Sequence, residues 1–176
     1  MSSQTNYSNA PGSVSKTNAS NSTGSNRYIC FNLGAQEYGV PLLSIKEVLG
    51  LPEVTPIPQC PSYFLGIMNL RGKVISVMDL RTKIGLKSQN NSETSVMILD
   101  LGEQLLGVVV DKVNAVITIN NKDITEAPKM EETKATDYIE NVYRHEENLI
   151  LLISIAKALS IEDHLVLNNQ QIKIAS

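Results

Sequence analysis

A chain of 176 residues can form one ordinary domain, or two very small ones that share a core, but not a multidomain enzyme. Its 18 acidic side chains outnumber 15 basic ones and give a net charge of -3, which argues against electrostatic capture of a nucleic-acid backbone. Two Phe and no Trp leave Val, Ile and Leu to fill the interior, and such residues favour strands.

The cysteines and the N-terminal sequence bear on the cellular compartment. Cys30 and Cys60 form no CxxC pair, and the N-terminus lacks the charged start and apolar run of a signal peptide. No apolar run reaches the roughly 18 residues of a membrane-spanning helix. We therefore expect a cytoplasmic protein with reduced thiols and no direct membrane insertion.

The first segment of the chain, residues 1–26, consists mostly of Ser, Asn and Thr, and Lys16 is its one charged side chain. Such a composition offers almost nothing to bury and predicts a disordered tail. A dispensable leader is favoured over a tether or docking segment, because no motif stands out.

From Arg27 onward, short apolar segments alternate with turn residues. In "RYICFNLG", Ile29, Phe31 and Leu33 recur at every second position, the period of a half-buried strand. The similar segments that follow are "EYGVP", "LLSIKEVLG", "FLGIMNL", "KVISVMDL", "SVMILDLG", "LLGVVVD", "NAVITI", "YIENVYRH" and "NLILLIS". Short strands punctuated by turns predict an all-β fold of one or two small barrels.

The connections support this interpretation. "LGAQEY", "LGEQLLG" and "HEENL" each place turn residues between apolar runs and predict hairpins. The units "FNLGAQEYGVP" and "LDLGEQLLGVVV" are similar, which suggests two related barrels side by side. The four prolines of "PEVTPIPQCP" cannot all donate to a central ladder, so this stretch is expected at an edge or in an extended connection.

Helix is expected in only two places. One short helix is predicted from Leu80 to Ile84, with Asp79 as its N-cap and Gly85 as its stop. The stretch "SIAKALSIEDHLVL" predicts two more short helices near the C-terminus, capped by Ser154 and Ser160.

The sequence carries no recognisable catalytic or cofactor motif. GxxxxGK[ST], HExxH and GxSxG are all absent, so no enzyme, cofactor or metal is predicted. His145 and His164 are separated and are expected at the surface, Cys30 is expected inside a barrel, and neither thiol has a cationic neighbourhood that would activate it. An enzyme with an unfamiliar site would require a pocket of titratable residues.

The hairpin "NLRGKVISVMDLR" places a cation at a turn. Gly72 supplies the backbone angles of a tight turn, so Arg71 projects at its tip or folds back along the sheet. An arginine there can bind a carboxylate or backbone carbonyls of another chain. A local ion pair with Asp79 or Glu47 is an equally good interpretation.

The segment "LLSIKEVLG" raises a similar question. Residues alternate sides along a strand, so Ile45 and Glu47 are expected to share a face. An apolar side chain and a carboxylate on one exposed edge suit the side of a partner helix. In the alternative interpretation, Ile45 belongs to the core and Glu47 to its rim.

Together, "NLRGKVISVMDLR", the preceding "IPQCPSYFLGIMNL", "EYGVPLLSIKEV" and the later "DLGEQLLGVVVDKV" resemble the CheW-like coupling domain of bacterial chemotaxis. The resemblance implies two five-stranded SH3-like barrels over residues 27–168, followed by a C-terminal tail at 169–176. It implies a groove that receives the cytoplasmic tip of a chemoreceptor, and it implies no catalysis. One departure is Ser76, where the family usually has proline.

The resemblance also implies binding residues. The receptor groove would use Ile45, Glu47, Gly66, Asn69, Arg71, Gly72 and Val96. Contacts with the kinase would lie on the second barrel, at Gly107 and Val113.

The expected function is that of an adaptor in a two-component system. It would couple methyl-accepting chemoreceptor tips to the CheW-like regulatory domain of a CheA-type histidine kinase, within arrays at the inner membrane. A monomer in solution is expected, with ring formation in arrays left open. The alternatives are an SH3-like interaction module of another signalling pathway and a nucleic-acid-binding barrel, which would need a basic face with exposed aromatics.

Overall fold

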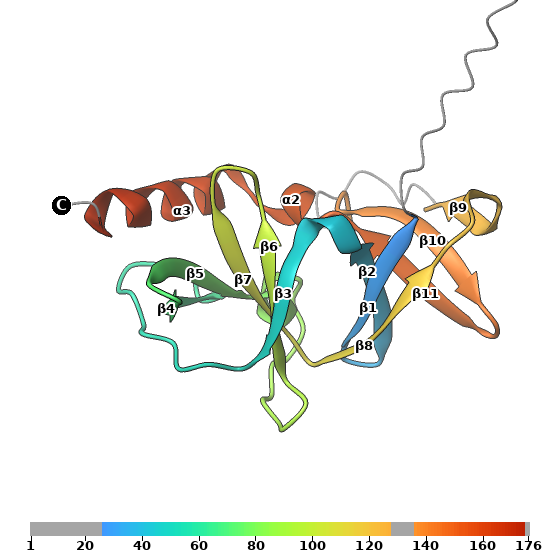
Figure 1. The fold of residues 1–176 in the computed structure, drawn as a ribbon, viewed down its shortest axis with the longest axis horizontal. Coiled ribbons are helices and arrows are strands. Elements are labelled where there is room, and N and C mark those ends of the chain that lie inside the picture. The colour runs from blue at the N-terminus through green and yellow to red at the C-terminus, as the bar shows by residue number, and fades with distance from the viewer. Residues whose placement is uncertain (1–25, 128–135, 175–176) are drawn as a thin grey trace, which may run out of the picture.

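A computed structural model describes residues 26–127 and 136–174 of the chain, and it describes side chains as far as Asn169. The tail predicted for residues 1–26 falls, except for Asn26, outside the described residues. In the described part, two β-sheets lie side by side, with helices along one edge (Figure 1). No described helix is long and apolar enough to cross a membrane.

One sheet has six strands in the order β8-β1-β2-β11-β10-β9. Its strands are β1 (Arg27–Leu33), β2 (Gln36–Pro41), β8 (Lys112–Thr118), β9 (Ile124–Glu126), β10 (Ile139–His145) and β11 (Asn148–Ile153). The β2–β11 pair is parallel and the other pairs are antiparallel. The last hairpin of the chain therefore lies beside the first.

The other sheet has five strands in the order β3-β6-β7-β5-β4. Its strands are β3 (Ile45–Gly50), β4 (Phe64–Leu70), β5 (Lys73–Asp79), β6 (Ser95–Asp100) and β7 (Leu105–Val110). The β5–β7 pair is parallel, so β5 lies inside the sheet with β4 and β7 on either side. Both β3 and β4 are edge strands.

The predicted all-β architecture with short helices is confirmed, and each predicted strand is present. One sheet has six strands where five were expected, because β9 was not predicted. β9 has three residues and one half-buried apolar side chain, so it carries no alternation that a sequence pattern could reveal.

The described part of the chain has five helices, of which three begin at the predicted caps and two, both 3₁₀ helices, were not predicted. They are η1 (Leu42–Ser44), α1 (Leu80–Lys83), η2 (Asn121–Asp123), α2 (Ile155–Ala158) and α3 (Ile161–Ile174). The Asp79 carboxylate accepts hydrogen bonds from the first turn of α1, and Ser154 Oγ accepts one from the first turn of α2. α3 continues to Ile174, through part of the stretch 169–176 that was expected to be a tail.

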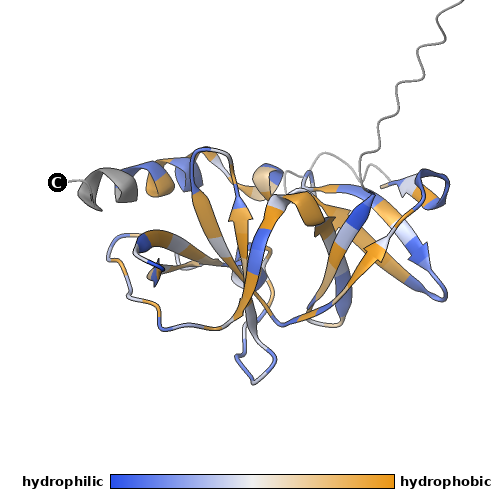
Figure 2. Cartoon of the chain, in the orientation of Figure 1, coloured by the Kyte–Doolittle hydropathy of each residue, from blue (hydrophilic) through white to orange (hydrophobic). Residues whose placement is uncertain are grey.

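The core lies on both faces of each sheet, and Figure 2 shows apolar residues running through the strands. The largest cluster joins side chains from both sheets, among them Phe31 and Val40 from one and Met97 and Val108 from the other. A second cluster lies on the opposite face of the five-stranded sheet, and a third lies on the opposite face of the six-stranded sheet. Burial on both faces explains the nearly continuous apolar runs of β6 and β7.

A buried carboxylate fastens α3 to the rest of the fold. Asp163 is fully buried, pairs with Lys83 Nζ, and accepts hydrogen bonds from Tyr63 Oη and Ser160 N, both at 2.7 Å. Burial by itself would raise the pKa of Asp163, but the hydrogen bonds from Lys83, Ser160 and Tyr63 outweigh it and lower the pKa. Asp163 is therefore held ionised beside Lys83.

This arrangement predicts a loss of stability in acid. A carboxyl with a lowered folded-state pKa stabilises the fold above its unfolded pKa of about 3.9, and the contribution is lost as the pH falls through the folded value. Asp163→Asn is therefore expected to lower the melting temperature at pH 7 and to weaken its dependence on pH below about 5. Thermal unfolding across this range measures both effects. The control is Asp123→Asn, at an exposed position; equal pH profiles for the two variants would contradict the prediction.

Candidate functional site

The β4–β5 hairpin turns through two residues in the left-handed backbone region. Arg71 has a φ of 50° and Gly72 a φ of 84°, the combination found in two-residue hairpin turns of type I′. Asn69 Oδ1 accepts a hydrogen bond from Gly72 N at 2.8 Å. The turn is thus fixed by backbone geometry and by one side chain, and Arg71 stands at its tip as predicted.

Arg71 forms a two-pronged ion pair with Glu47 of β3. Its Nη1 and Nη2 donate to Oε1 and Oε2 of Glu47, each at 2.8 Å. The Arg71 side chain remains 74% exposed and that of Glu47 22%. Hydrogen bonding to Glu47 raises the pKa of Arg71, so the charge is permanent. Of the two partners considered from the sequence, Glu47 is the one found.

The predicted sharing of one face by Ile45 and Glu47 is wrong. Ile45 lies opposite Leu99, whereas Glu47 lies opposite Ile98, because the register shifts between them. Leu99 belongs to the cluster between the sheets, against which Ile45 packs, and Ile98 belongs to the cluster of the five-stranded sheet. A β-bulge adds one residue to a strand and so reverses the alternation beyond it.

Two other residues assigned to the receptor groove are buried. Gly66 has a φ of 140°, and a Cβ atom there would lie 2.0 Å from the carbonyl oxygen of Thr55. Val96 has no exposed surface and packs in the cluster of the five-stranded sheet. Both can influence a binding surface through packing beneath it. The exposed part of the predicted set is Asn69, Arg71 and Gly72, with the half-buried Glu47 beside them.

The two residues assigned to the kinase contact lie on different sheets. Gly107 is buried in β7 of the five-stranded sheet, and a Cβ atom added to it would lie 3.2 Å from Val96 Cγ1. Val113 lies half-buried on β8 of the six-stranded sheet and packs against the cluster between the sheets. Their expected placement on one barrel is therefore wrong, because the chain crosses from one sheet to the other between them.

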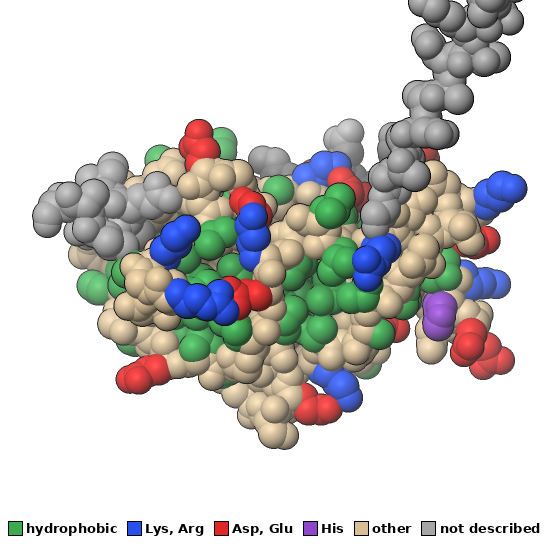
Figure 3. All heavy atoms as spheres, in the orientation of Figure 1, with side chains coloured by type: hydrophobic (Ala, Val, Ile, Leu, Met, Phe, Trp, Pro, Cys, Tyr) green, Lys and Arg blue, Asp and Glu red, His purple; other side chains and the backbone are tan. Residues whose placement is uncertain are grey.

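Exposed apolar side chains lie on β3, which carries Glu47, on the segments directly before and after it, and on β8. They come from η1, β3 and β8 and from the start of the proline-rich connection, and are Leu43, Val48, Leu51 and Val116. Figure 3 shows hydrophobic side chains over the junction of the two sheets, with charged side chains around them. Such a surface, apolar in the middle and charged at its rim, suits a protein partner.

A groove of about 550 Å³ runs beside the hairpin and is lined by Lys46, Lys73, Ser76 and Asp100, among others. Lys46 Nζ pairs with Asp100 Oδ2 at 2.8 Å. The hydrogen bond from Lys46, followed by that from the backbone N–H of Gly102, lowers the pKa of Asp100. Ser76 of β5 contributes to the wall of this groove.

The structure gives the exposure of the histidines and of Cys30. His145 and His164 are exposed, as predicted. Cys30 is buried, as predicted, and burial together with the charge of Glu37 raises the pKa of its thiol to about 12. Among the described residues, no group of three or more His, Cys, Asp or Glu is placed to hold a metal ion.

The comparison with protein families decides the relationship. The model of the CheW-like domain matches residues 27–163. The chain belongs to the CheW-like family. Its two open, side-by-side sheets correspond to the two SH3-like barrels of that fold.

Individual CheW proteins are similar over most of the chain. The chemotaxis protein CheW of Klebsiella aerogenes is 34% identical over 143 residues, which cover 81% of this chain and 86% of the relative. The chemotaxis protein CheW of Rhizobium meliloti is 28% identical and covers 80% of this chain and 91% of its own. The crystal structure of the scaffolding protein TtCheW from Thermoanaerobacter tengcongensis matches with a TM-score of 0.72 and 27% identity, covering 78% of this chain and 94% of that one.

The sequence did not reveal a second polar cluster, formed by Arg81 with Asp79, Asn90 and Asp111. The Arg81 side chain is only 1% exposed and makes ion pairs with Asp79 and Asp111 at 2.8 Å. Arginine is seldom buried, so residue type alone pointed to the surface. The available signal was "DLR" at the end of a strand, where Asp79 was recognised only as a helix cap.

Proposed function

We propose that this chain is a chemotaxis scaffold that couples the cytoplasmic tips of chemoreceptors to a CheA-type histidine kinase. The observation that carries the proposal is the Arg71–Glu47 pair, which fixes an exposed cation on a two-residue turn against β3, a strand with the exposed apolar side chain of Val48. The match of the CheW-like domain to residues 27–163 and the likeness to chemotaxis CheW proteins support it. In this role the protein is cytoplasmic and reaches the inner membrane through receptor arrays.

The receptor surface in this proposal centres on the hairpin tip and β3. Arg71 binds a carboxylate or backbone carbonyls at the receptor tip, while Glu47 holds the guanidinium in place. Asn69 and Gly72 flank Arg71 in the hairpin, Ile45 lies on the other face of β3, and Gly66 and Val96 support the surface from below. The kinase surface uses Val113 on β8, with Gly107 shaping β7 next to Val96.

Kinase autophosphorylation tests the proposal. Receptor-containing membranes and a CheA-type kinase from the same cell are incubated with and without this protein, and a large rise in phosphorylated kinase is expected when it is present. An unchanged rate with all three proteins folded would overturn the proposed function and favour an SH3-like module of another pathway.

Arg71→Ala is expected to weaken binding to receptor membranes by about tenfold, the effect of losing one anchor residue, and to leave the fold intact because the side chain is exposed. Co-sedimentation and thermal unfolding measure the two effects. Arg144→Ala is the matched control, since it removes an exposed arginine near the tip of the β10–β11 hairpin. Equal affinities of the two variants for receptor membranes would show that Arg71 forms only a local ion pair and does not bind the receptor.

A further inference from the structure

A single residue, Asp111, connects β7 of the five-stranded sheet to β8 of the six-stranded sheet. β7 ends at Val110 in the five-stranded sheet, and β8 begins at Lys112 in the six-stranded sheet. The backbone of Asp111 is therefore a point about which one sheet could turn relative to the other; the chain also crosses between the sheets at η1. A connection of one residue is short, but it leaves two soft backbone dihedrals.

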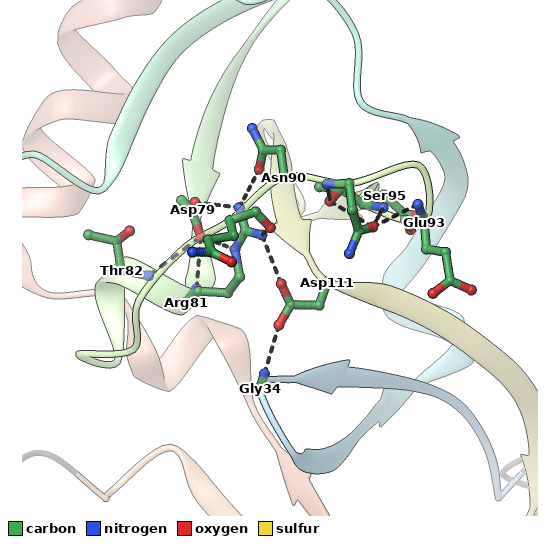
Figure 4. Close-up of polar contacts among 11 residues, drawn as sticks. Gly34, Asp79, Arg81, Thr82, Asn90, Glu93, Ser95 and Asp111 are labelled. Carbon is green, nitrogen blue, oxygen red and sulfur yellow. Dashed lines mark hydrogen bonds and ion pairs between the residues drawn. The ribbon is translucent and has the colours of Figure 1, made fainter.

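The side chain of Asp111 is bonded to both sheets at once (Figure 4). Its Oδ1 accepts a hydrogen bond from Arg81 Nη1 at 2.8 Å, on the side of the five-stranded sheet. Its Oδ2 accepts one from Gly34 N at 2.7 Å, in the β1–β2 turn of the six-stranded sheet. The N–H of Asp111 donates to Asn32 O at 3.1 Å. The crossing point is thus held on both sides.

Arg81 is a rigid anchor for this bridge. Its Nε and Nη2 donate to the Asp79 carboxylate, and its remaining N–H groups donate to Gln89 O, Asn90 Oδ1 and Asp111 Oδ1. An arginine has five N–H donors, and all five are used. A buried guanidinium with every donor satisfied cannot rotate without leaving polar groups unpaired, which is costly.

The apolar packing between the sheets lacks this directionality. The cluster between them contains apolar side chains from both, such as Phe31 and Met97. Apolar contact scales with buried area and does not depend strongly on direction, so it tolerates small rotations that keep the area buried. A charged bridge with fixed bond directions does not tolerate them.

We propose that Asp111 is a positioning residue that locks the angle between the two sheets. The restraint on the angle, called the lock below, is inferred from the hydrogen bonds of Asp111 alone. Its role in signalling rests on the proposed function. The receptor surface lies on the five-stranded sheet at Arg71, and the kinase contact at Val113 lies on the six-stranded sheet, two residues beyond the lock. Because the angle between the sheets is fixed, a structural change at the receptor surface is transmitted to the kinase surface.

Substitution of Asp111 separates the lock from the fold. In Asp111→Asn the side chain keeps its size but has one acceptor oxygen, so it can satisfy Arg81 or Gly34 but not both from their present positions. Asp111→Ala removes both bonds. Lys112→Gln is the matched control, because it breaks the neighbouring exposed pair with Glu93 and leaves the lock intact.

The angle is measured as a distance distribution between two spin labels by pulsed electron paramagnetic resonance. Labels are attached at Lys73→Cys and Arg144→Cys, exposed positions on different sheets, in a Cys60→Ser background. Cys30 is buried with its thiol protonated, so it does not react. We expect a broader distribution for Asp111→Asn, broader still for Asp111→Ala, and no change for Lys112→Gln. If Asp111→Ala does not fold, Asp111→Asn decides.

A distribution as narrow in the folded Asp111 variant as in the parent protein would overturn the lock. Kinase activation then tests its use: Asp111→Asn should bind receptor membranes normally yet activate the kinase at least about fivefold less, the lower end of typical coupling between sites. Normal activation with a broadened distribution would refute a role in coupling. If the parent protein itself does not activate the kinase, the proposed function fails, while the distance measurement still decides the lock.

Discussion

Arg81→Leu is expected to lower the free energy of unfolding by about 3–5 kcal/mol, the usual effect of breaking a buried ion pair on one side. The substitution removes five donated hydrogen bonds and leaves the carboxylate of Asp79, which is 3% exposed, without its countercharge. Urea denaturation measures the loss through the midpoint and slope of the transition.

The effect should be specific to the buried arginine. Arg144→Leu makes the same chemical change at an exposed strand position and is expected to alter stability by less than about 0.5 kcal/mol. Arg81→Lys keeps the charge but cannot reproduce the two-pronged contact with Asp79, so it should recover only part of the loss. Similar midpoints for Arg81→Leu and Arg144→Leu would show that the buried cluster contributes little to stability.

Gly66→Ala is expected to be the most damaging change of a single methyl group. The new Cβ would lie 2.0 Å from Thr55 O and 2.8 Å from Pro56 Cα. Both are backbone atoms, so no side chain can rotate away, and the φ of 140° is one that alanine rarely adopts. Overpacking and backbone strain together should cost about 2–5 kcal/mol.

The consequences should reach the hairpin tip. Thr55 and Ile67 exchange backbone hydrogen bonds at 2.8 and 2.9 Å, next to Gly66, and a displaced connection would break them. We expect altered amide chemical shifts along β4 and weaker binding to receptor membranes. The control is Gly50→Ala, where nothing lies within 4 Å of the new atom. If Gly66→Ala folds and has the same urea midpoint as Gly50→Ala, the short distance between Gly66 and Thr55 does not limit stability, and the prediction is wrong.

Local signals in the sequence predicted the local features well. A glycine after Arg71 between two apolar runs identified the hairpin turn, and Asp79, Ser154 and Ser160 identified the starts of helices, because these residues act on backbone groups within a few positions. Alternation and apolar runs located the strands in the same way. The bulge at Lys46 left no such trace, and it reversed the predicted face of Glu47.

Burial was harder to predict than secondary structure. Val96 lies in a strand whose neighbours on both faces are apolar, so period-two alternation could not separate a surface position from the core. Arg81 is buried because Asp79, Asp111 and a loop after α1 converge on it. That convergence is a property of the folded chain and not of any short window of sequence.

The sequence by itself determined that the protein is mostly β, where its turns and caps lie, and which family it resembles, because these depend on residues near one another along the chain. Only the tertiary structure decided that Glu47 pairs with Arg71 and that Asp111 joins the local partner Asp79 in holding Arg81. Glu47 lies 24 positions from Arg71, and Asp111 lies 30 positions from Arg81 and 77 from Gly34. Any Asp or Glu could pair with an arginine on chemistry alone, so the choice belongs to the fold that brings these residues within hydrogen-bonding distance.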